Sequence, residues 1–509
     1  MTTLSVLPPA GPFPAIASPV LRLSAGVVDS LDALLLVVPA PPRRHGLASL
    51  PRGALVLRRF RARERRAGEV FTARLPNTAQ TLVVVGITRD GASRFEQLEL
   101  AGRMVHELPL EECRTIGAAA SGLEPDEEAG VVAACLSAAM AAHFRLPRAV
   151  GKRDSRPRRP APRLVPVARE PVPVERIAAV AAGNNLARWL TALPPNALTP
   201  GAYRRGVQQL ARRRGWRTRF YDENALRRLG AEAFLAVTQG SARRDAGILH
   251  VRYRPRGARG APVALVGKGL CFDTGGTNLK SHRSMLDMHT DMAGSAGALG
   301  ALLALDAIGH RRPVDLWLAL AENRIGPAAY QPQDVVTALN GTTIQVIHTD
   351  AEGRMALADT LALASRSAPA AIIDLATLTG ACVTALTERM SGVFTNRPEL
   401  RAPIEDAGTT SGERVWVLPS PPDFDADLES KVADVVQCLV EGKGDHIYAA
   451  RFLSRFVAKD IPWLHVDLSA ATRHGGLAHI PTDITGFGVA YLVALLADGS
   501  FPAAPRRPR

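Results

Sequence analysis

Residues 263–280 read Val263-Ala-Leu-Val-Gly-Lys-Gly-Leu-Cys-Phe-Asp-Thr-Gly-Gly-Thr-Asn-Leu-Lys280. The stretch opens with four apolar residues, a pattern that is typical of a buried strand. Lys268 and Asp273 follow within one short segment, and the paired glycines before Lys280 allow the backbone to turn tightly. We therefore expect a strand that leads into a polar loop, and these three charged residues are the first candidate functional residues.

Similar apolar runs recur on both sides of this segment. Stretches with helical periodicity, at residues 293–308 and 355–367, separate them. The predicted strands are Ile248–Tyr253, Val263–Val266, Val314–Leu320 and Ala371–Leu375. Continuous apolar strands that alternate with helices favour a mostly parallel sheet with helices on both faces. Ligands of such sheets bind beyond the carboxyl ends of the strands.

The length of the chain favours two domains, because 509 residues exceed what one ordinary hydrophobic core can organise. In residues 1–150, β-prone runs alternate with helix-like segments, which predicts a small N-terminal α/β domain. Residues 151–175 are rich in Pro and Arg and have no helical or strand period, so we interpret them as a linker. Residues 176–500 would form the larger C-terminal domain, with its mostly parallel central sheet flanked by helices, and residues 501–509 a basic tail.

The chain carries a formal net charge of +14. Arginine-rich runs lie at Arg58–Arg66, Lys152–Arg169, Arg212–Arg219 and Arg506–Arg509. Such a surplus could support loose binding to nucleic acid or to a membrane surface. However, no helix-turn-helix, zinc-finger or RNA-binding aromatic motif accompanies it, and we favour a solvated basic face.

The composition predicts a cytoplasmic protein. No apolar run is long enough to cross a bilayer, and the N-terminus lacks the basic start of a secretory signal. The cysteines are odd in number and form no CxxC pair, which indicates reduced, buried thiols. They are Cys113, Cys135, Cys271, Cys382 and Cys438.

Two further polar clusters lie beside predicted helices. Asp291 precedes a helix of small residues, and the segment His348-Thr-Asp350-Ala-Glu352-Gly-Arg354 opens another. A single Asp before a helix is usually an N-cap. Four carboxylates at one sheet edge, however, would repel one another strongly unless cations lay between them. Carboxylate oxygens suit Mg²⁺ or Mn²⁺ and also bind Zn²⁺, so the combination predicts a metal site.

A lysine among these carboxylates is unusual. As a metal ligand Lys268 would have to be neutral, which a nearby dication would enforce by lowering its pKa. Other site types fit less well. No glycine immediately precedes Lys280, so the phosphate-binding GxxxxGK[ST] spacing is absent, and the chain contains neither GxSxG nor HExxH. We interpret the nearby His282, His289 and His348 as flanking residues.

The segment Thr349-Asp-Ala-Glu-Gly-Arg354 resembles the signature NTDAEGR of the leucyl aminopeptidases, the cytosol aminopeptidase family of two-metal exopeptidases. The resemblance extends over roughly residues 180–490, whereas the first 150 residues are compatible with the variable N-terminal domain of the family. Family counterparts occur in the same order for Pro194-Pro-Asn196 with Thr199-Pro200, Val266-Gly-Lys-Gly269, Phe272-Asp-Thr-Gly-Gly276, Asp291-Met292, Ala321-Glu-Asn323, Ala376-Thr-Leu-Thr-Gly-Ala381, Ser411-Gly-Glu-Arg-Val-Trp416 and Thr485-Gly-Phe-Gly-Val489.

The resemblance implies a role for each of five metal ligands. Asp273 and Glu352 would bridge two divalent metal ions in each subunit. Lys268 and Asp291 would complete one metal site, and Asp350 would complete the other. Manganese or zinc is the expected metal, and magnesium is the third candidate.

The resemblance also implies a catalytic pair that does not bind the metals. Arg354 would hold a bicarbonate that acts as the general base. Lys280 would polarise the scissile carbonyl and stabilise the gem-diolate. The pocket for the N-terminal side chain of the substrate would be lined by Met288, Thr377, Leu378 and Gly380.

The leading hypothesis is therefore a metal-dependent aminopeptidase, a homohexamer by resemblance, that removes N-terminal leucine or other apolar residues from peptides. Two other hypotheses stay open. The charge and the basic linker would suit a nucleic-acid-binding or scaffolding protein that retains the fold, and a metal-dependent phosphoesterase would share the carboxylates. The chain departs from the family pattern at His348, where the signature has Asn, and in residues 440–448.

Overall fold

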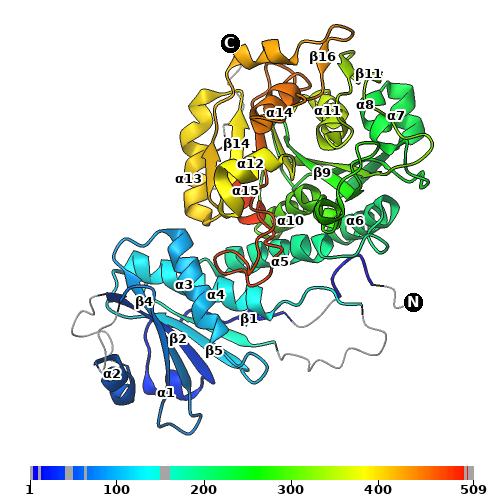
Figure 1. Ribbon diagram of the computed structural model, residues 1–509. Helices are drawn as coiled ribbons and strands as arrows, with labels where there is room; N and C mark the ends of the chain where they lie inside the picture. The colour runs from blue at the N-terminus through cyan, green and yellow to red at the C-terminus, as the bar shows by residue number, and fades with distance from the viewer. Residues whose placement is uncertain are drawn as a thin grey trace.

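The computed structural model of the protein describes residues 4–9, 13–40, 50–61, 66–149, 161–497 and 501. Over these residues the chain forms two α/β domains, the smaller built from the N-terminal part (Figure 1). The first ten residues of the predicted linker and the predicted basic tail after residue 501 lie outside the described residues.

The N-terminal domain is built on a six-stranded sheet. Its elements are β1 (Ala15–Ile16), α1 (Ala25–Asp29), β2 (Ala33–Ala40), α2 (Ala54–Arg61), β3 (Val70–Arg74), β4 (Leu82–Arg89), α3 (Arg94–His106), β5 (Thr115–Ala120), α4 (Pro125–His143) and β6 (Arg163–Val167). The strand order is β1-β6-β5-β2-β4-β3, and only the β3–β4 pair is antiparallel. Alternate residues of β2 enter two different cores, so that α3 and α4 pack on one face of the sheet and α1 and α2 on the other. The predicted α/β character of this region is confirmed.

The prediction of a structureless linker at residues 151–175 is wrong for its second half. Residues 163–167 form β6, which pairs with β5 over five residues and with the short β1. Pro166 hides the strand in the sequence, because proline has no N–H to donate to a sheet. It is tolerated here since on the side away from β5 the strand β6 pairs only with the two-residue β1, and the carbonyl of Pro166 still accepts a hydrogen bond from the backbone N–H of Val20 (2.9 Å).

The larger domain is built on an eight-stranded sheet in the order β15-β14-β17-β13-β9-β10-β8-β7, with a separate three-stranded sheet β11-β12-β16. Strands β17, β13, β9 and β10 at its centre are all parallel to one another. The elements are α5 (Val174–Thr191), α6 (Pro200–Arg214), β7 (Arg217–Asp222), α7 (Glu223–Leu229), α8 (Glu232–Thr238), β8 (Gly247–Tyr253), β9 (Val263–Asp273), α9 (His282–Met285), η1 (Met288–Thr290), α10 (Ala293–Ala307), β10 (Val314–Asn323), β11 (Val335–Thr337), β12 (Thr343–Gln345), α11 (Glu352–Ser365), β13 (Ala371–Ala376), α12 (Gly380–Leu386), η2 (Thr387–Arg389), β14 (Ser391–Thr395), η3 (Pro398–Leu400), α13 (Arg401–Ser411), β15 (Val415–Val417), η4 (Pro422–Leu428), β16 (Val435–Val436), α14 (Asp445–Ser454), β17 (Trp463–Asp467) and α15 (Val489–Ala497).

Both faces of the central sheet are buried. In β9, Val263 and Leu265 enter the core that contains α5, α10 and α15, whereas Ala264 and Val266 enter the core that contains α8, α11 and α14. This is why the central strands appear in the sequence as continuous apolar runs. The predicted mostly parallel sheet with helices on both faces is confirmed.

Strand β9 is longer than predicted. It continues past Val266 to Asp273, so that Lys268 lies in the middle of a strand and not in a loop. Gly267 interrupts the apolar run for a steric reason: a Cβ atom at this position would lie 2.4 Å from Cα of Ser295 on α10. The glycine allows α10 to approach the sheet, and it conceals the strand when hydrophobicity alone is considered.

The N-terminal residues extend onto the larger domain. Trp189 on α5 donates a hydrogen bond from Nε1 to the carbonyl of Ser5 (3.1 Å), and Leu7 is buried in the core of the larger domain. Helices α3 and α4 lie on the side of the small sheet that faces the larger domain (Figure 1), and α4 packs against α5. Residues 4–7, which were predicted to belong to the first domain, thus pack on the second.

Candidate metal centre and active site

The candidate site lies where four parallel strands end. Asp273 is the last residue of β9 and pairs in register with Asn323, the last residue of β10. On the other side, Thr377 follows the last residue of β13, and Asp467 ends β17. Polar residues from adjacent parallel strands therefore meet at one sheet edge, which is the usual ligand site of this architecture.

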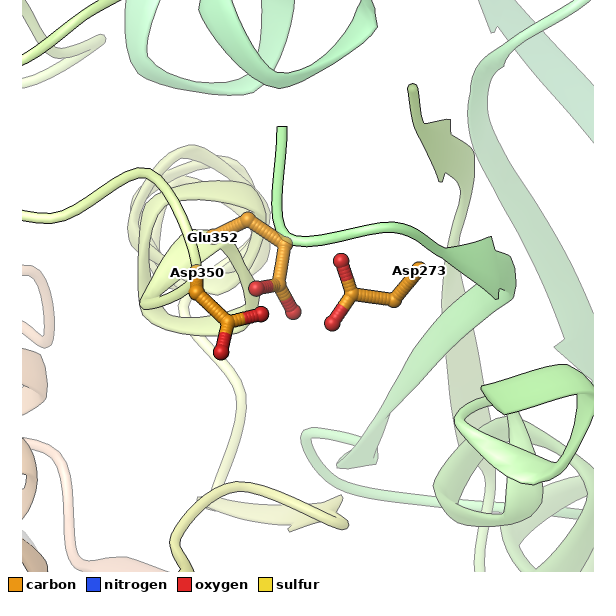
Figure 2. A group of neighbouring side chains, drawn as sticks. All are labelled: Asp273, Asp350 and Glu352. Carbon is orange, nitrogen blue, oxygen red and sulfur yellow. The ribbon is translucent and has the colours of Figure 1, made fainter. Parts of the chain in front are cut away.

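Two helices bring the remaining predicted ligands to this edge. Asp291 follows η1 and precedes α10, whereas Asp350 and Glu352 stand at the start of α11. Figure 2 shows the carboxylates of Asp273, Asp350 and Glu352 turned toward one another, and one oxygen from each lies within 4.8 Å of the others. The segment His348–Arg354 and the end of β9 thus contribute to one acidic group.

Two lysines link the acidic side chains. The Nζ atom of Lys268 lies 2.9 Å from Oδ1 of Asp291 and 3.0 Å from Oε1 of Glu352. The Nζ atom of Lys280 lies 2.9 Å from Oδ2 of Asp273 and 2.5 Å from Oδ1 of Asp350. The structure therefore brings the five predicted ligands and Lys280 into one cluster.

Asn323 and Tyr330 support the cluster, and neither was predicted from the sequence to have a role. Asn323 donates from Nδ2 to Oδ1 of Asp273 (2.8 Å) and to the carbonyl of Thr349 (3.0 Å). The hydroxyl of Tyr330 donates to the same carbonyl (2.8 Å). These bonds fix Asp273 against the turn that carries Asp350. The usable signal in the sequence was the position of Asn323 at the end of the strand adjacent to β9.

Burial and mutual repulsion make the cluster reluctant to ionise fully. Burial, and then the negative charge of Asp273, raise the pKa of Glu352 to about 8. Burial also raises the pKa of Asp291 to about 6, although the ammonium of Lys268 acts against it. The pKa of Asp350 is raised by the same two causes as that of Glu352. Additional positive charge at this position would therefore be strongly stabilising.

The lysines supply part of that charge. Burial alone would lower the pKa of Lys268, but the carboxylates of Asp291 and Glu352 outweigh it and raise that pKa above its usual value. The pKa of Lys280 is raised in the same way, chiefly by Asp273. A divalent cation bound to the carboxylates would reverse this balance and favour the neutral amine of Lys268.

The donor atoms present fit a divalent metal. Oδ2 of Asp291 and Oε2 of Glu352 are buried, and neither has a hydrogen-bond partner among the residues that the structure describes. Buried carboxylate oxygens rarely lack a partner, because leaving them unpaired is costly. Hard oxygen donors of this kind suit Mg²⁺, Mn²⁺ or Zn²⁺.

Arg354 is buried beside the cluster but binds other groups. Its Nη2 donates to Oδ2 of Asp445 (2.6 Å), and its Nη1 donates to the carbonyl of Gln437 (3.1 Å). The side chain of Gln437 in turn accepts hydrogen bonds from the backbone of Ile347 and His348 (3.1 Å each). Neither Gln437 nor Asp445 was predicted from the sequence, because both are distant in the chain and match no motif.

Two of the four predicted pocket residues contact the site. Thr377 donates from Oγ1 to Oδ1 of Asp291 (2.6 Å), and its carbonyl accepts from Lys268 (2.9 Å). The backbone N–H of Leu378 donates to Oδ1 of Asp467 (3.2 Å), a buried carboxylate that was also not predicted. Of the remaining two, Met288 is the first residue of η1, the short helix that ends directly before Asp291. Gly380 is the exposed first residue of α12.

His348 is exposed, in contrast to the acidic residues around it. Its Nδ1 accepts a hydrogen bond from the backbone N–H of Asp350 (3.3 Å). This contact makes the histidine part of the turn that presents Asp350. None of the three flanking histidines belongs to the acidic group in the described part of the chain.

The comparisons with known proteins agree with this geometry. Residues 185–493 match the sequence profile of the cytosol aminopeptidase family, catalytic domain. A probable cytosol aminopeptidase of Parasynechococcus marenigrum (strain WH8102) is 37% identical over 429 residues, which cover 81% of this chain and 85% of that relative. A probable cytosol aminopeptidase of Syntrophotalea carbinolica is 44% identical over 326 residues, 64% of this chain and 65% of that relative.

Solved structures show the same relationship. The bottromycin maturation enzyme BotP in complex with Mn superposes with a TM-score of 0.79 at 31% identity, covering 92% of this chain and 99% of that chain. A mutant of tomato leucine aminopeptidase gives a TM-score of 0.83 at 27% identity, covering 97% and 98%. The chain therefore belongs to the cytosol aminopeptidase family and is a metal-dependent hydrolase of the exopeptidase class.

Proposed function

We propose that the protein is an aminopeptidase that hydrolyses the N-terminal peptide bond of peptides and prefers leucine or other apolar N-terminal residues. The observation that carries the proposal is the convergence of Lys268, Asp273, Asp291, Asp350 and Glu352 at the carboxyl edge of the central sheet. The names of the relatives support the activity.

In this proposal the five residues hold two divalent metal ions. By the family resemblance, Asp273 and Glu352 would hold both ions, Lys268 and Asp291 would hold one of them, and Asp350 would hold the other. Bound metals would lower the pKa of a water molecule and stabilise the charge that develops on the attacked carbonyl. Manganese is favoured because the similar enzyme BotP forms a complex with Mn, and zinc and magnesium suit the same oxygen donors.

Lys280 and Arg354 would supply charge without binding metal. The ammonium of Lys280 already lies beside Asp273 and Asp350, where an oxyanion of the substrate would develop, and such a group commonly contributes several kcal/mol. The bicarbonate that the resemblance implies at Arg354 stays a prediction, and the guanidinium binds the carboxylate of Asp445.

The experiment uses the purified protein, stripped with a chelator and then reloaded with Mn²⁺ or Zn²⁺. We expect the reloaded enzyme to cleave leucine p-nitroanilide and leucine amide, and the stripped enzyme to lose this activity. N-acetyl-leucine p-nitroanilide is the matched control, because its blocked amine should prevent cleavage. Hydrolysis of p-nitrophenyl phosphate in place of the peptides would favour the phosphoesterase alternative, and no turnover with any metal would refute the proposal.

Location and assembly also belong to the proposal. All five cysteines are free and buried, which agrees with the predicted cytoplasmic setting. In the part of the chain that the structure describes, no helix combines the length and the apolar character needed to span a membrane. The homohexamer implied by the resemblance is proposed as the working assembly.

Part of the basic surface has a role in the fold. In the run Arg212–Arg219, the guanidinium of Arg219 lies 4.5 Å from the ring centre of Tyr221, and Arg214 pairs with Asp306 (3.6 Å). Several residues of the other basic runs lie outside the described residues. Binding to nucleic acid therefore stays a prediction from charge alone, and the aminopeptidase is the function that the site geometry supports.

A further inference from the structure

Arg354 is paired with a carboxylate that the chain itself provides. Arg354 is 1% exposed, and its Nη2 atom lies 2.6 Å from Oδ2 of Asp445. The other oxygen of Asp445, Oδ1, is buried and has no hydrogen-bond partner among the described residues. One half of this carboxylate therefore holds the arginine, and the other half remains an unused acceptor.

The fold holds Asp445 beside the candidate site. Asp445 is the first residue of α14, and α14 packs against both α11 and α12. The first turn of α11 carries Glu352 and Arg354, and the segment before α12 carries Thr377 and Leu378. The start of α14 is thus packed beside the two segments that form the metal cluster and the predicted pocket.

The electrostatics place Arg354 between two acidic groups. The carboxylate of Asp445 pairs with the guanidinium, and Glu352 stands two residues before Arg354 on the first turn of α11. A buried guanidinium is strongly destabilising when its anion is removed. Arg354 therefore needs an anion, and Asp445 provides one.

An external anion would have to displace this internal one. A carboxylate held in place by a folded helix acts at an effective concentration far above the millimolar range of dissolved anions. Bicarbonate would therefore compete poorly for Arg354 as long as Asp445 is present. An enzyme of this design would not depend on bicarbonate.

We propose that Asp445 is the resident anion of Arg354, that it orients the guanidinium for catalysis, and that it takes the place of external bicarbonate. Asp445 acts through Arg354 and is a positioning residue. The catalytic consequence rests on the proposed aminopeptidase function, whereas the exclusion of an external anion from Arg354 can be measured independently of any activity.

The test compares the wild type with the variants Asp445→Ala, Asp445→Asn and Asp445→Ala/Arg354→Met, all loaded with Mn²⁺ and freed of excess metal. Asp425→Asn is the matched control. Asp425 lies on η4 and pairs with Arg451 (2.9 Å), which is on α14 like Asp445, and it contacts no predicted site residue in the described structure. Cleavage of leucine p-nitroanilide is followed in carbonate-free buffer and with added bicarbonate. Binding of ¹³C-bicarbonate is followed separately by the broadening of its NMR signal.

We expect the wild type and Asp425→Asn to be fully active without bicarbonate and to cause no specific broadening. Asp445→Ala and Asp445→Asn should lower kcat by roughly 10-fold to 100-fold, as is typical for residues that orient a functional group. Bicarbonate should bind to Asp445→Ala and restore much of its rate, because the shortened side chain leaves room for the anion. The additional Arg354→Met change should abolish both effects.

Three results would overturn the inference. They are a wild-type rate that requires bicarbonate, a bicarbonate signal that the wild type broadens as strongly as Asp445→Ala does, and full activity of both Asp445 variants in carbonate-free buffer. If Asp445→Ala does not fold, the wild-type measurements and the isosteric Asp445→Asn still decide. If the wild type cleaves no peptide substrate, the proposed function fails, and the NMR comparison alone decides which anion Arg354 binds.

Discussion

Lys268 and Lys280 occupy different positions in the same cluster. The side chain of Lys268 is 4% exposed, and its Nζ atom is surrounded by groups from three segments: Asp291, Glu352 and Thr377. The side chain of Lys280 is 13% exposed and lies on the other side of the acidic group. This difference agrees with a metal-ligand role for Lys268 and a substrate-facing role for Lys280.

Replacing Lys280 should separate catalysis from metal binding. We expect Lys280→Met to lower kcat by roughly 100-fold to 1,000-fold, the usual effect of losing a group that stabilises an oxyanion. Bound metal should not decrease, because removing the ammonium leaves Asp273 and Asp350 more negative. Steady-state kinetics and metal analysis of the same preparation check both statements. An unchanged kcat, or a loss of metal, would contradict the assigned role.

Replacing Glu352, in contrast, should weaken metal binding itself. Glu352→Gln removes a charge and replaces one carboxylate oxygen by an amide nitrogen, which cannot bind a metal. We expect the bound metal to fall below the wild-type stoichiometry and activity to fall with it. Glu429→Gln is the matched control, because Glu429 is exposed on the same domain. Metal analysis after dialysis gives the readout, and retention of the full metal content would count against a bridging role.

At the residue scale, the sequence predicted the chemical groups of the site better than it predicted their supports. Asp350 and Glu352 stand close together in the chain, and the unusual density of carboxylates indicated a metal. Asn323, Asp445 and Asp467 fix the site from distant segments, and each is an ordinary polar residue where it occurs in the sequence. Their roles depend on tertiary contacts that no local pattern contains.

The start of helix α11 presents Asp350, Glu352 and Arg354, and a glycine makes this arrangement possible. A Cβ atom on Gly353 would lie 2.6 Å from both Cε and Nζ of Lys268 and 2.9 Å from Cδ1 of Leu378. The absence of a side chain at position 353 thus allows Lys268 to reach Glu352. A methyl group at position 353 would clash with Lys268, so the close approach of the two residues requires glycine.

Gly353→Ala should therefore disturb the metal centre without removing any ligand. We expect Lys268 to be displaced, and the affinity for the metal to fall by roughly 10-fold to 100-fold. Gly26→Ala is a suitable control, because Gly26 is also helical and a Cβ atom there would meet nothing within 4 Å. Metal titration of both variants provides the measurement. Equal affinities in the two variants would show that the close approach is not required.

Asp359 links α11 to two neighbouring segments. It is fully buried and accepts hydrogen bonds from the backbone N–H groups of Phe234 and Leu339 (2.7 Å each). Burial outweighs these bonds and raises the pKa of Asp359 to about 7. The folded protein therefore keeps this proton at pH values at which the unfolded chain has lost it.

The sign of the resulting pH dependence follows directly. The pKa of Asp359 is 3.8 in its unperturbed state, and the contribution of this group to stability is complete below that value and is lost as pH rises to about 7. The loss is on the order of 4 kcal/mol, since one pKa unit corresponds to about 1.4 kcal/mol. Urea unfolding of the wild type and Asp359→Asn, both in chelator, measures it. We expect a steeper fall with pH in the wild type, and equal slopes would contradict the assignment.

At the element scale, the sequence located the central strands but not all of their ends. Apolar runs identified β9 and β10 because both faces of the sheet are buried. Gly267 and Pro166 concealed the second half of β9 and all of β6, since both residues disfavour strands locally and are tolerated only because of their neighbours. In the second half of β9 and in β6, tertiary packing therefore outweighs the low strand propensity of glycine and proline.

The assembly of the whole molecule can be tested in solution. Apolar side chains are exposed in loops near the candidate site, namely Leu279, Leu286 and Ile325. Contiguous apolar patches mark contacts between subunits, and these three residues would belong to such a patch if the subunits assemble through these loops. We expect light scattering on a size-exclusion column to give six times the 54.2 kDa of one chain. A monomer at micromolar concentration would refute the proposed homohexamer and leave the metal site unaffected.

The central claim is that two metal ions bind between five named side chains. Crystals of the Mn²⁺-loaded protein, measured at the manganese absorption edge, would test it most directly. We predict two anomalous peaks, roughly 3.5–4 Å apart. Both peaks should contact Asp273 and Glu352, one should also contact Lys268 and Asp291, and the other Asp350. A single peak, or peaks bound by other residues, would contradict the claim.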